Sequence, residues 1–298
     1  MRVRGVSACG LTGTLGVAIR TAVALLVLGG ATAAHAQDEE EDDSGVAGGG
    51  EVEEEEGEDG KPKQPPVTSG GLFSKANYPS SELARPLTIS KGMVEVRAGL
   101  GTDVSSKTAF ESFSGLLEAR YGVQDNFEVS ASFALGETLV RGGAAIEGSL
   151  AYDLLNIRLG AVGSRSKTAL PGGDTAVRKA FEVELGFPLR YAFKPQFGLV
   201  ALETLLTFGD GKPDLTPAVA VVGQPVPSVS VLLRAKMIIP DLDVDAEGFV
   251  VPGTLAVQTA AGAAMDVGLE FTFTNMKPPE GVKFYDQREL VLYVKARM

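Results

Sequence analysis

The sequence predicts an all-β fold: a closed antiparallel up-and-down transmembrane β-barrel of about 12 strands (roughly 10 to 14), preceded by a disordered acidic segment. Three observations lead to this prediction. Apolar residues alternate with polar or small ones in segments long enough to cross a bilayer, the connections between these segments are short and long in turn, and the excess acidic charge lies in one N-terminal stretch. Together they predict three parts, over residues 1–36, 37–84 and 85–298.

Residues 1–36 have the features of a cleaved secretory signal peptide. Three arginines precede an apolar stretch over residues 21–34, and Ala34-His35-Ala36 provides the small-residue pattern that a signal peptidase recognises. A membrane anchor is the alternative, but about 14 apolar residues are fewer than the roughly 20 that a spanning helix needs. We therefore expect export of the chain and removal of this segment.

The predicted signal contains Cys9 and His35, which are the one Cys and the one His of the chain. Without them the mature chain cannot form a disulfide, a zinc site, a Cys nucleophile or a Ser-His-Asp triad. We therefore expect no enzyme activity, no catalytic residue, no cofactor and no metal site. The balance of 38 Asp and Glu against 27 Lys and Arg also disfavours nucleic acid as a partner.

Residues 37–84 form the predicted acidic linker. Two runs rich in Asp and Glu, over residues 38–43 and 51–59, are separated by a Gly-rich piece and followed by a Pro-rich piece over residues 61–66. Charge repulsion and the lack of apolar surface keep such a segment disordered. We expect a solvated tether in the periplasm, and a tail that binds a partner or a divalent cation is the alternative. The remaining chain is nearly neutral.

From residue 85 onward the sequence repeats the period of two that is typical of strands. In residues 181–194, large apolar side chains such as Phe181 and Phe187 share one face, while Glu182, Glu184 and Arg190 share the other. Segments of this length exceed the five or six residues usual in soluble sheets and match the roughly 9 to 11 that cross a bilayer at a tilt. Strands are expected to begin near residues 88, 110, 126, 143, 155, 178, 196, 214, 227, 252, 265 and 287.

The connections favour a closed barrel. Tight turns are expected at residues 124–126, 154–156, 194–196, 224–227 and 262–264, and longer loops at 103–109, 136–142, 167–177, 209–213, 240–251 and 275–286. Short turns on one side, longer loops on the other and an even number of strands are typical of outer-membrane barrels, in which closure pairs every strand edge. A secreted β-sandwich is the alternative, because its strands also alternate.

Two phrases carry a family resemblance: Arg85-Pro86-Leu87-Thr88-Ile89, and the stretch from Ala119 to Val129 across the second expected turn. They resemble phrases of Gram-negative outer-membrane β-barrel proteins, in particular the broad transporter and porin group that includes porins of phenol-degradation pathways. The resemblance implies a barrel in the cell outer membrane, in contact with outer-membrane lipid. It covers residues 85–135 in detail and the rest of the barrel as a pattern.

The last strand alternates up to the end of the chain. Leu290, Leu292 and Val294 share one face, and the sequence ends within the strand at Met298. Such an ending is similar to the β-signal of outer-membrane proteins, so the barrel assembly machinery is an expected partner. These signals usually end in Phe, and Met298 departs from that pattern.

If the apolar face meets lipid, the charged residues of the other face lie in the lumen. The expected pore-lining residues are Glu95, Arg97, Glu118, Arg120, Glu128, Arg158, Glu182, Glu184, Arg190, Arg234, Lys236, Glu270, Lys295 and Arg297, with Glu147, Asp153, Lys194, Glu203 and Asp266 on the same face. The two signs are nearly balanced, which favours cross-strand salt bridges, or a narrow lumen with acidic and basic walls, over a single-sign ion filter.

Two functions follow from this interior. A narrow channel or transporter for a small-molecule solute is favoured, because barrels with polar interiors are most often channels. A closed structural or surface-interaction barrel, which acts through its extracellular loops and acidic tail, is the alternative. Acid–base work by carboxylates would fall to Glu182 with Glu184, or to the run from Asp241 to Asp245. A salt-bridge lattice and an exposed loop are the favoured interpretations of those two groups.

Overall fold

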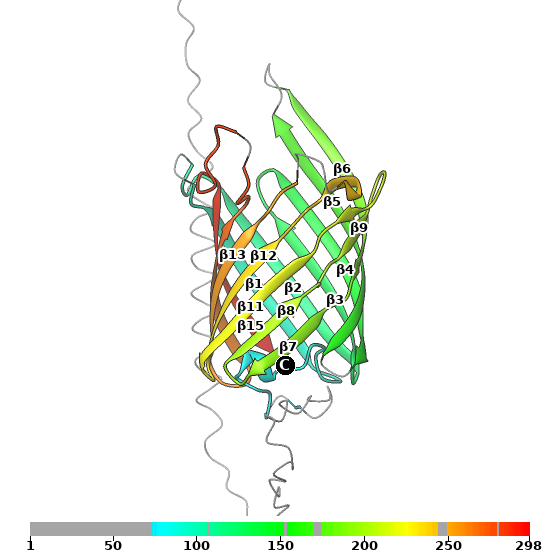
Figure 1. The fold of residues 1–298 in the computed structure, drawn as a ribbon, viewed down its shortest axis with the longest axis vertical. Helices are drawn as coiled ribbons and strands as arrows, with labels where there is room; N and C mark the ends of the chain where they lie inside the picture. The colour runs from blue at the N-terminus through cyan, green and yellow to red at the C-terminus, as the bar shows by residue number, and fades with distance from the viewer. Residues whose placement is uncertain are drawn as a thin grey trace, which may run out of the picture. The chain divides into compact units, whose positions relative to one another are not determined.

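The structure is a computed structural model, and it describes residues 73–298 except 75, 106–107, 152–153, 170–173, 244–248 and 279. The expected signal peptide and the two acidic runs lie outside the described residues. Fifteen strand segments form one antiparallel sheet that closes into a barrel (Figure 1). Among the described residues, no helix has the length and the apolar character needed to cross a membrane.

The elements are two short 3-10 turns and the strand segments. The turns are η1 (Glu82–Ala84) and η2 (Pro240–Leu242). The strand segments are β1 (Val94–Asp103), β2 (Phe113–Gln124), β3 (Phe127–Leu135), β4 (Leu139–Ala151), β5 (Leu155–Ala169), β6 (Thr175–Gly186), β7 (Leu189–Lys194), β8 (Phe197–Ala201), β9 (Leu206–Phe208), β10 (Asp214–Leu215), β11 (Ala218–Val226), β12 (Val229–Lys236), β13 (Gly253–Ala260), β14 (Met265–Phe273) and β15 (Arg288–Arg297).

Three strands of the barrel are each divided into two segments, so the barrel has the 12 strands that the sequence predicts. β6 continues as β7, β8 as β9, and β10 as β11. Pro188 and Pro217 lie at two of these breaks, where a residue without a backbone N–H interrupts the ladder. At the third break Leu202 has a φ of 60°. Pairing of β1 with β15, from Glu95 opposite Arg297 onward, closes the barrel and excludes the sandwich alternative.

Most strands begin within a few residues of their expected starts, but three expectations are wrong. The loop expected over residues 167–177 is shorter, because β5 and β6 pair as far as Ala169 and Thr175. The first strand begins at Val94 rather than near residue 88, because the chain reverses at Gly92, whose φ is +76°. The residues before this turn lie inside the barrel, where Ile89 is fully buried. The expected loop over residues 136–142 is also wrong. Gly142 and Gly143 do not end the strand but pair within the ladder of β3 and β4.

The tight turns lie where they are expected, at the end of the barrel that also holds the C-terminus and the segment before β1 (Figure 1). At the turn from β2 to β3, Asn126 takes a φ of 66°, a left-handed conformation that Asn tolerates better than most residues. At the opposite end, the hairpin of β5 and β6 extends beyond its neighbours (Figure 1, green). The two ends of the barrel are therefore unlike.

In this barrel apolar side chains face outward and charged side chains face inward, which is the reverse of a soluble barrel. Large apolar residues on the outer face are exposed: Leu117, Ile146, Leu159, Phe181 and Leu233 are among them. Charged and polar residues are buried inside: Glu95, Glu128, Glu147, Asp266 and Arg297 are among them. The alternation of the sequence therefore places a charged layer within the barrel and an apolar belt around it.

Candidate functional site

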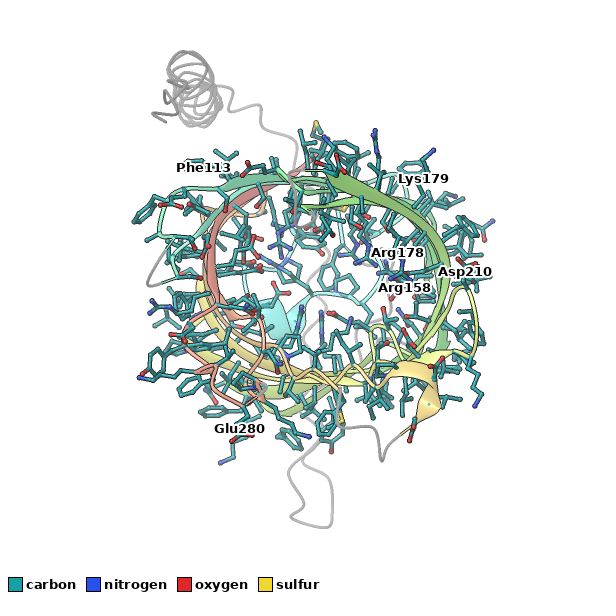
Figure 2. The ribbon with its side chains drawn as sticks, turned by 90° about the horizontal axis from the view of Figure 1, so that it is seen from above. Phe113, Arg158, Arg178, Lys179, Asp210 and Glu280 are labelled. Atoms are coloured by element: carbon teal, nitrogen blue, oxygen red, sulfur yellow. The ribbon has the colours of Figure 1, made fainter. Side chains whose placement is uncertain are left out.

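The barrel encloses a cavity of about 540 Å³ whose wall is formed by inward-facing side chains from most of its strands. Seen from above, Arg158 and Arg178 point into the ring of strands, whereas Phe113 and Lys179 point out of it (Figure 2). Ion pairs occupy three levels of this interior. The first level is at the end that holds the tight turns and the segment before β1, which we name the closed end. The second is at mid-height, and the third is toward the opposite end, where the hairpin of β5 and β6 extends (Figure 1), which we name the wide end.

The segment before β1, residues 76–93, lies across the closed end and is fastened to the wall by buried ion pairs. Both terminal nitrogens of Arg85 donate to the carboxylate of Asp266 on β14, each at 2.8 Å. Asp266 also accepts from Arg297, whose Nε donates to Glu95 at 2.8 Å. Arg85 and Arg297 thus share one carboxylate that has no exposed surface.

A second fastening joins this segment to β2 and β3. The backbone N–H of Ile89 donates to Glu128 at 2.8 Å, and the same carboxylate accepts two hydrogen bonds from Arg120 at 2.9 and 2.8 Å. Arg120 donates in addition to the carbonyl of Leu87 at 2.6 Å. Gly122 permits this close approach, because a Cβ there would lie 2.1 Å from the carbonyl oxygen of Ser90.

Tyr78 and Glu82 complete the closed end. The ring of Tyr78 lies against the guanidinium groups of Arg85 and Arg297, at 5.7 and 4.7 Å from its centroid. Burial raises the pKa of Tyr78 to about 12. Burial alone would also raise the pKa of Glu82, but the positive charges of Lys295, Arg85 and Arg190 outweigh it and hold that pKa well below its usual range.

At mid-height, Arg97 on β1 pairs with a carboxylate on its neighbour β2 and with one on β14, which lies beyond β15. It pairs with Glu118 on β2 at 3.3 Å and with Glu270 on β14 at 2.7 Å. Its guanidinium also lies 4.1 Å from the centroid of the Tyr293 ring. Because Arg97 and both carboxylates remain partly exposed to the cavity, these pairs contribute little to stability and form a charged wall.

Toward the wide end the pairs are more exposed. Arg141 on β4 lies 2.8 Å from Glu184 and 4.0 Å from Glu182 on β6, so it reaches across β5. On the other side of the barrel, Arg234 pairs with Glu203 at 3.2 Å. These contacts leave both charge signs available to a solute that enters from this end.

One wall carries a cation without a carboxylate partner. Arg158 faces the cavity and has no ion pair within 4.0 Å in the part of the chain that the structure describes. Its cross-strand neighbour Glu147 instead accepts from Asn156 at 2.7 Å. The lumen is thus mixed in sign, and its two signs are nearly balanced.

Of the fourteen residues expected to line a pore, eleven lie on the cavity wall. These are Glu95, Arg97, Glu118, Arg120, Glu128, Arg158, Glu184, Arg190, Arg234, Glu270 and Lys295. Glu182 lies beside Arg141, Lys236 follows Arg234 by two residues on the same strand, and Arg297 is buried at the closed end. Of the further residues assigned to this face, Glu147 and Glu203 line the cavity, Asp266 is buried, and Lys194 is exposed. Asp153 lies outside the described residues.

Some residues of the interior are not among those expected from the sequence. Arg141 falls in the loop expected over residues 136–142, although its spacing of two from Gly143 places it on the inward face of β4. Glu82 and Arg85 precede the first strand, so strand alternation says nothing about them. Tyr293 donates to Gln258 at 3.0 Å, a contact between uncharged groups that a search for charges misses.

Among the described residues, no group of three or more His, Cys, Asp or Glu side chains is placed to hold a metal ion. Within the acidic run after β12, the backbone N–H of Asp241 donates to Asp214 at 3.0 Å. Asp245 lies outside the described residues.

Comparison with known proteins finds similarity to solved barrels. No family model matches the sequence, and no curated protein matches it. The KdgM porin is similar at 5% identity, over 68% of this chain and 98% of that one, with a TM-score of 0.48. The NanC porin is similar at 11% identity, over 69% of this chain and 100% of that one, with a TM-score of 0.44. Acinetobacter baumannii outer membrane protein Omp33 is similar at 14% identity, over 70% of this chain and 99% of that one, with a TM-score of 0.41.

Proposed function

We propose that this chain is an outer-membrane β-barrel that passes small solutes through a narrow lumen. The observation that carries the proposal is the reversed distribution of side chains, with exposed large apolar residues outside and ion pairs around a cavity inside. In water the outer face would expose an apolar belt larger than the patches that soluble monomers tolerate. Lipid would cover that belt, and a closed sheet meets the need of a bilayer for paired backbone groups.

The same proposal assigns the parts of the chain to compartments. Residues 1–36 would be removed as a signal peptide, and residues 37–84 would form an acidic tether in the periplasm. Residues 85–298 would form the barrel, with the tight-turn end toward the periplasm and the hairpin of β5 and β6 on the outer side. The barrel assembly machinery would recognise β15, which closes the barrel against β1.

The dimensions favour a narrow passage. Barrels of about eight strands are filled by side chains, and barrels of 16 or more hold an aqueous channel, so 12 strands lie between these cases. The lining of Arg97, Arg141, Glu184 and Arg234 offers hydrogen-bond donors and acceptors of both signs. This lining suits small hydrophilic solutes and gives weak ion selectivity.

A second candidate is a closed structural barrel whose loops and tail act instead. One observation favours it: the segment before β1 lies across the closed end and is held there by Asp266 and Glu128. The barrel could therefore conduct only around this segment, or after the segment has moved.

Single-channel recording tests both candidates. The full chain is refolded in detergent and inserted into a planar bilayer, and heat-modifiable migration on a gel first establishes that the barrel has folded. Discrete conductance steps support the channel. If the protein is folded and inserted but does not conduct, the closed structural barrel is the better candidate. A protein that stays soluble without detergent would refute both candidates.

A further inference from the structure

Three basic residues lie on the outer face of the hairpin formed by β5 and β6. Arg165 on β5 is directly opposite Lys179 on β6, and Lys167 follows Arg165 by two residues. Figure 2 shows Lys179 outside the ring of strands and Arg178 inside it. Because cross-strand partners, and residues two apart, share one face of a sheet, Arg165 and Lys167 also point outward. We name these three residues the rim cluster.

No carboxylate that the structure describes forms an ion pair with the rim cluster. Its three residues are exposed, and none has an ion pair within 4.0 Å among the residues that the structure describes. The one acidic residue of the hairpin between positions 159 and 181 is Asp174, beyond the cluster. Glu137 adjoins Thr138, whose carbonyl accepts from the backbone N–H of Lys167 at 2.8 Å, but Glu137 forms no ion pair within 4.0 Å with the described cluster. Like charges directly opposite each other destabilise a pair of strands, so Arg165 and Lys179 are poorly matched unless an anion lies between them.

The cluster begins where the apolar belt ends. A row of cross-strand neighbours runs from Leu135 through Val140 to Arg165 and Lys179. Leu135 and Val140 are exposed apolar residues, so this row changes from apolar to cationic at β5. On β6, Phe181 lies two residues below Lys179 on the same face and is 65% exposed. The charged headgroups of a lipid leaflet lie at this boundary between the apolar belt and water.

We propose that Arg165, Lys167 and Lys179 bind the phosphate of an outer-leaflet glycolipid, the phosphomonoester headgroup of lipid A. The proposal rests on the outer-membrane location proposed above. A phosphomonoester carries nearly two negative charges at neutral pH, which matches a cluster of three cations. The guanidinium of Arg165 can donate two parallel hydrogen bonds to it, and the two lysines add point charges. Binding relieves the repulsion between Arg165 and Lys179 and attaches the hairpin to the membrane surface.

Native mass spectrometry of the full chain in lipid nanodiscs tests the site. The nanodiscs contain phosphatidylcholine with either bisphosphorylated lipid A or the same lipid after removal of its phosphates. The test variant is Arg165→Gln with Lys179→Gln. The charge-matched control is Lys212→Gln with Lys283→Gln, which removes two exposed lysines from other loops. We expect the test variant to bind bisphosphorylated lipid A about thirtyfold more weakly than the control does.

The outcomes separate this site from the proposed function. The site is supported if lipid adducts form only with the phosphorylated lipid and are lost in the test variant but not in the control variant. Equal binding of the dephosphorylated lipid, or unchanged binding by the test variant, overturns it. Displacement of the lipid by millimolar inorganic phosphate overturns the lipid assignment in favour of soluble phosphate. A chain that does not enter nanodiscs refutes the membrane location itself, whereas absent conductance leaves the lipid result standing.

Discussion

Arg85 and Asp266 are separated by 181 residues in the chain, yet the guanidinium of Arg85 donates two hydrogen bonds of 2.8 Å to the carboxylate of Asp266. Arg85 belongs to the segment before β1, and Asp266 belongs to β14, so the pair fastens that segment across the closed end of the barrel. Asp266 also holds Arg297 of the closing strand. Removing one partner of a buried pair leaves an uncompensated charge, so the effect of a substitution depends on which partner is replaced.

Arg85→Gln is expected to loosen the segment before β1 and leave the barrel intact, because Asp266 keeps its contact with Arg297. Single-channel conductance should therefore increase. Asp266→Asn removes the carboxylate that two arginines share, and we expect it to destabilise the barrel by about 3 to 5 kcal/mol. The loss of the heat-resistant form on a gel with rising temperature measures this. Glu118→Gln, which removes a partly exposed pair, is the control, and an equal effect there would contradict the prediction.

Tryptophan substitution tests which face meets lipid. The chain has no Trp, so a single introduced indole provides the only indole emission. Phe181→Trp on the outer face should be strongly quenched by brominated phosphatidylcholine. Ser132→Trp on the cavity wall should be quenched weakly by that lipid and more strongly by aqueous iodide. The reverse pattern would mean that the two faces are assigned wrongly.

Ion selectivity should follow the charge at the wide end. The balanced lumen predicts a reversal potential near zero in a salt gradient. Arg141→Glu replaces the partner of Glu184 and Glu182 by a third carboxylate, so the reversal potential should shift toward the value for cations. Lys212→Glu makes the same charge change on an exposed loop and should produce little shift. Equal shifts in the two variants would argue that Arg141 does not face the conducting path.

Tyr78 should make attachment of the segment before β1 sensitive to alkali. Burial raises its pKa to about 12, above the ordinary tyrosine value of about 10, so its contribution to stability is complete below about pH 10 and decreases as the pH rises toward 12. The groups that face it are Glu95, Arg85, Arg120 and Arg297. Absorbance titration of the chain minus that of Tyr78→Phe should show one tyrosine with a midpoint near pH 12. A midpoint near pH 10 would mean that the ring is exposed.

Alternation along the strands predicts the faces of this barrel well, because the direction of a side chain is a local property of an extended chain. Phe181 was expected outside and is exposed there, while Glu184 was expected inside and lies on the cavity wall. Where the local signal was ambiguous the prediction failed. Adjacent glycines such as Gly142 and Gly143 occur in loops and also in strands, so the expected loop over residues 136–142 included Arg141, which the structure places in β4.

The sequence by itself predicted a barrel of about 12 strands and the residues that share each face, since these follow from a period of two and from the lengths of the connections. The pairing of β1 with β15 in the tertiary structure excluded the sandwich. Only the tertiary structure decided which charges meet. Alternation places Asp266 and Glu128 on the inner face, but it cannot select Arg85 or Ile89 as their partners. Those contacts join positions distant in the chain, and they form because a buried carboxylate must find donors wherever the closed sheet brings them.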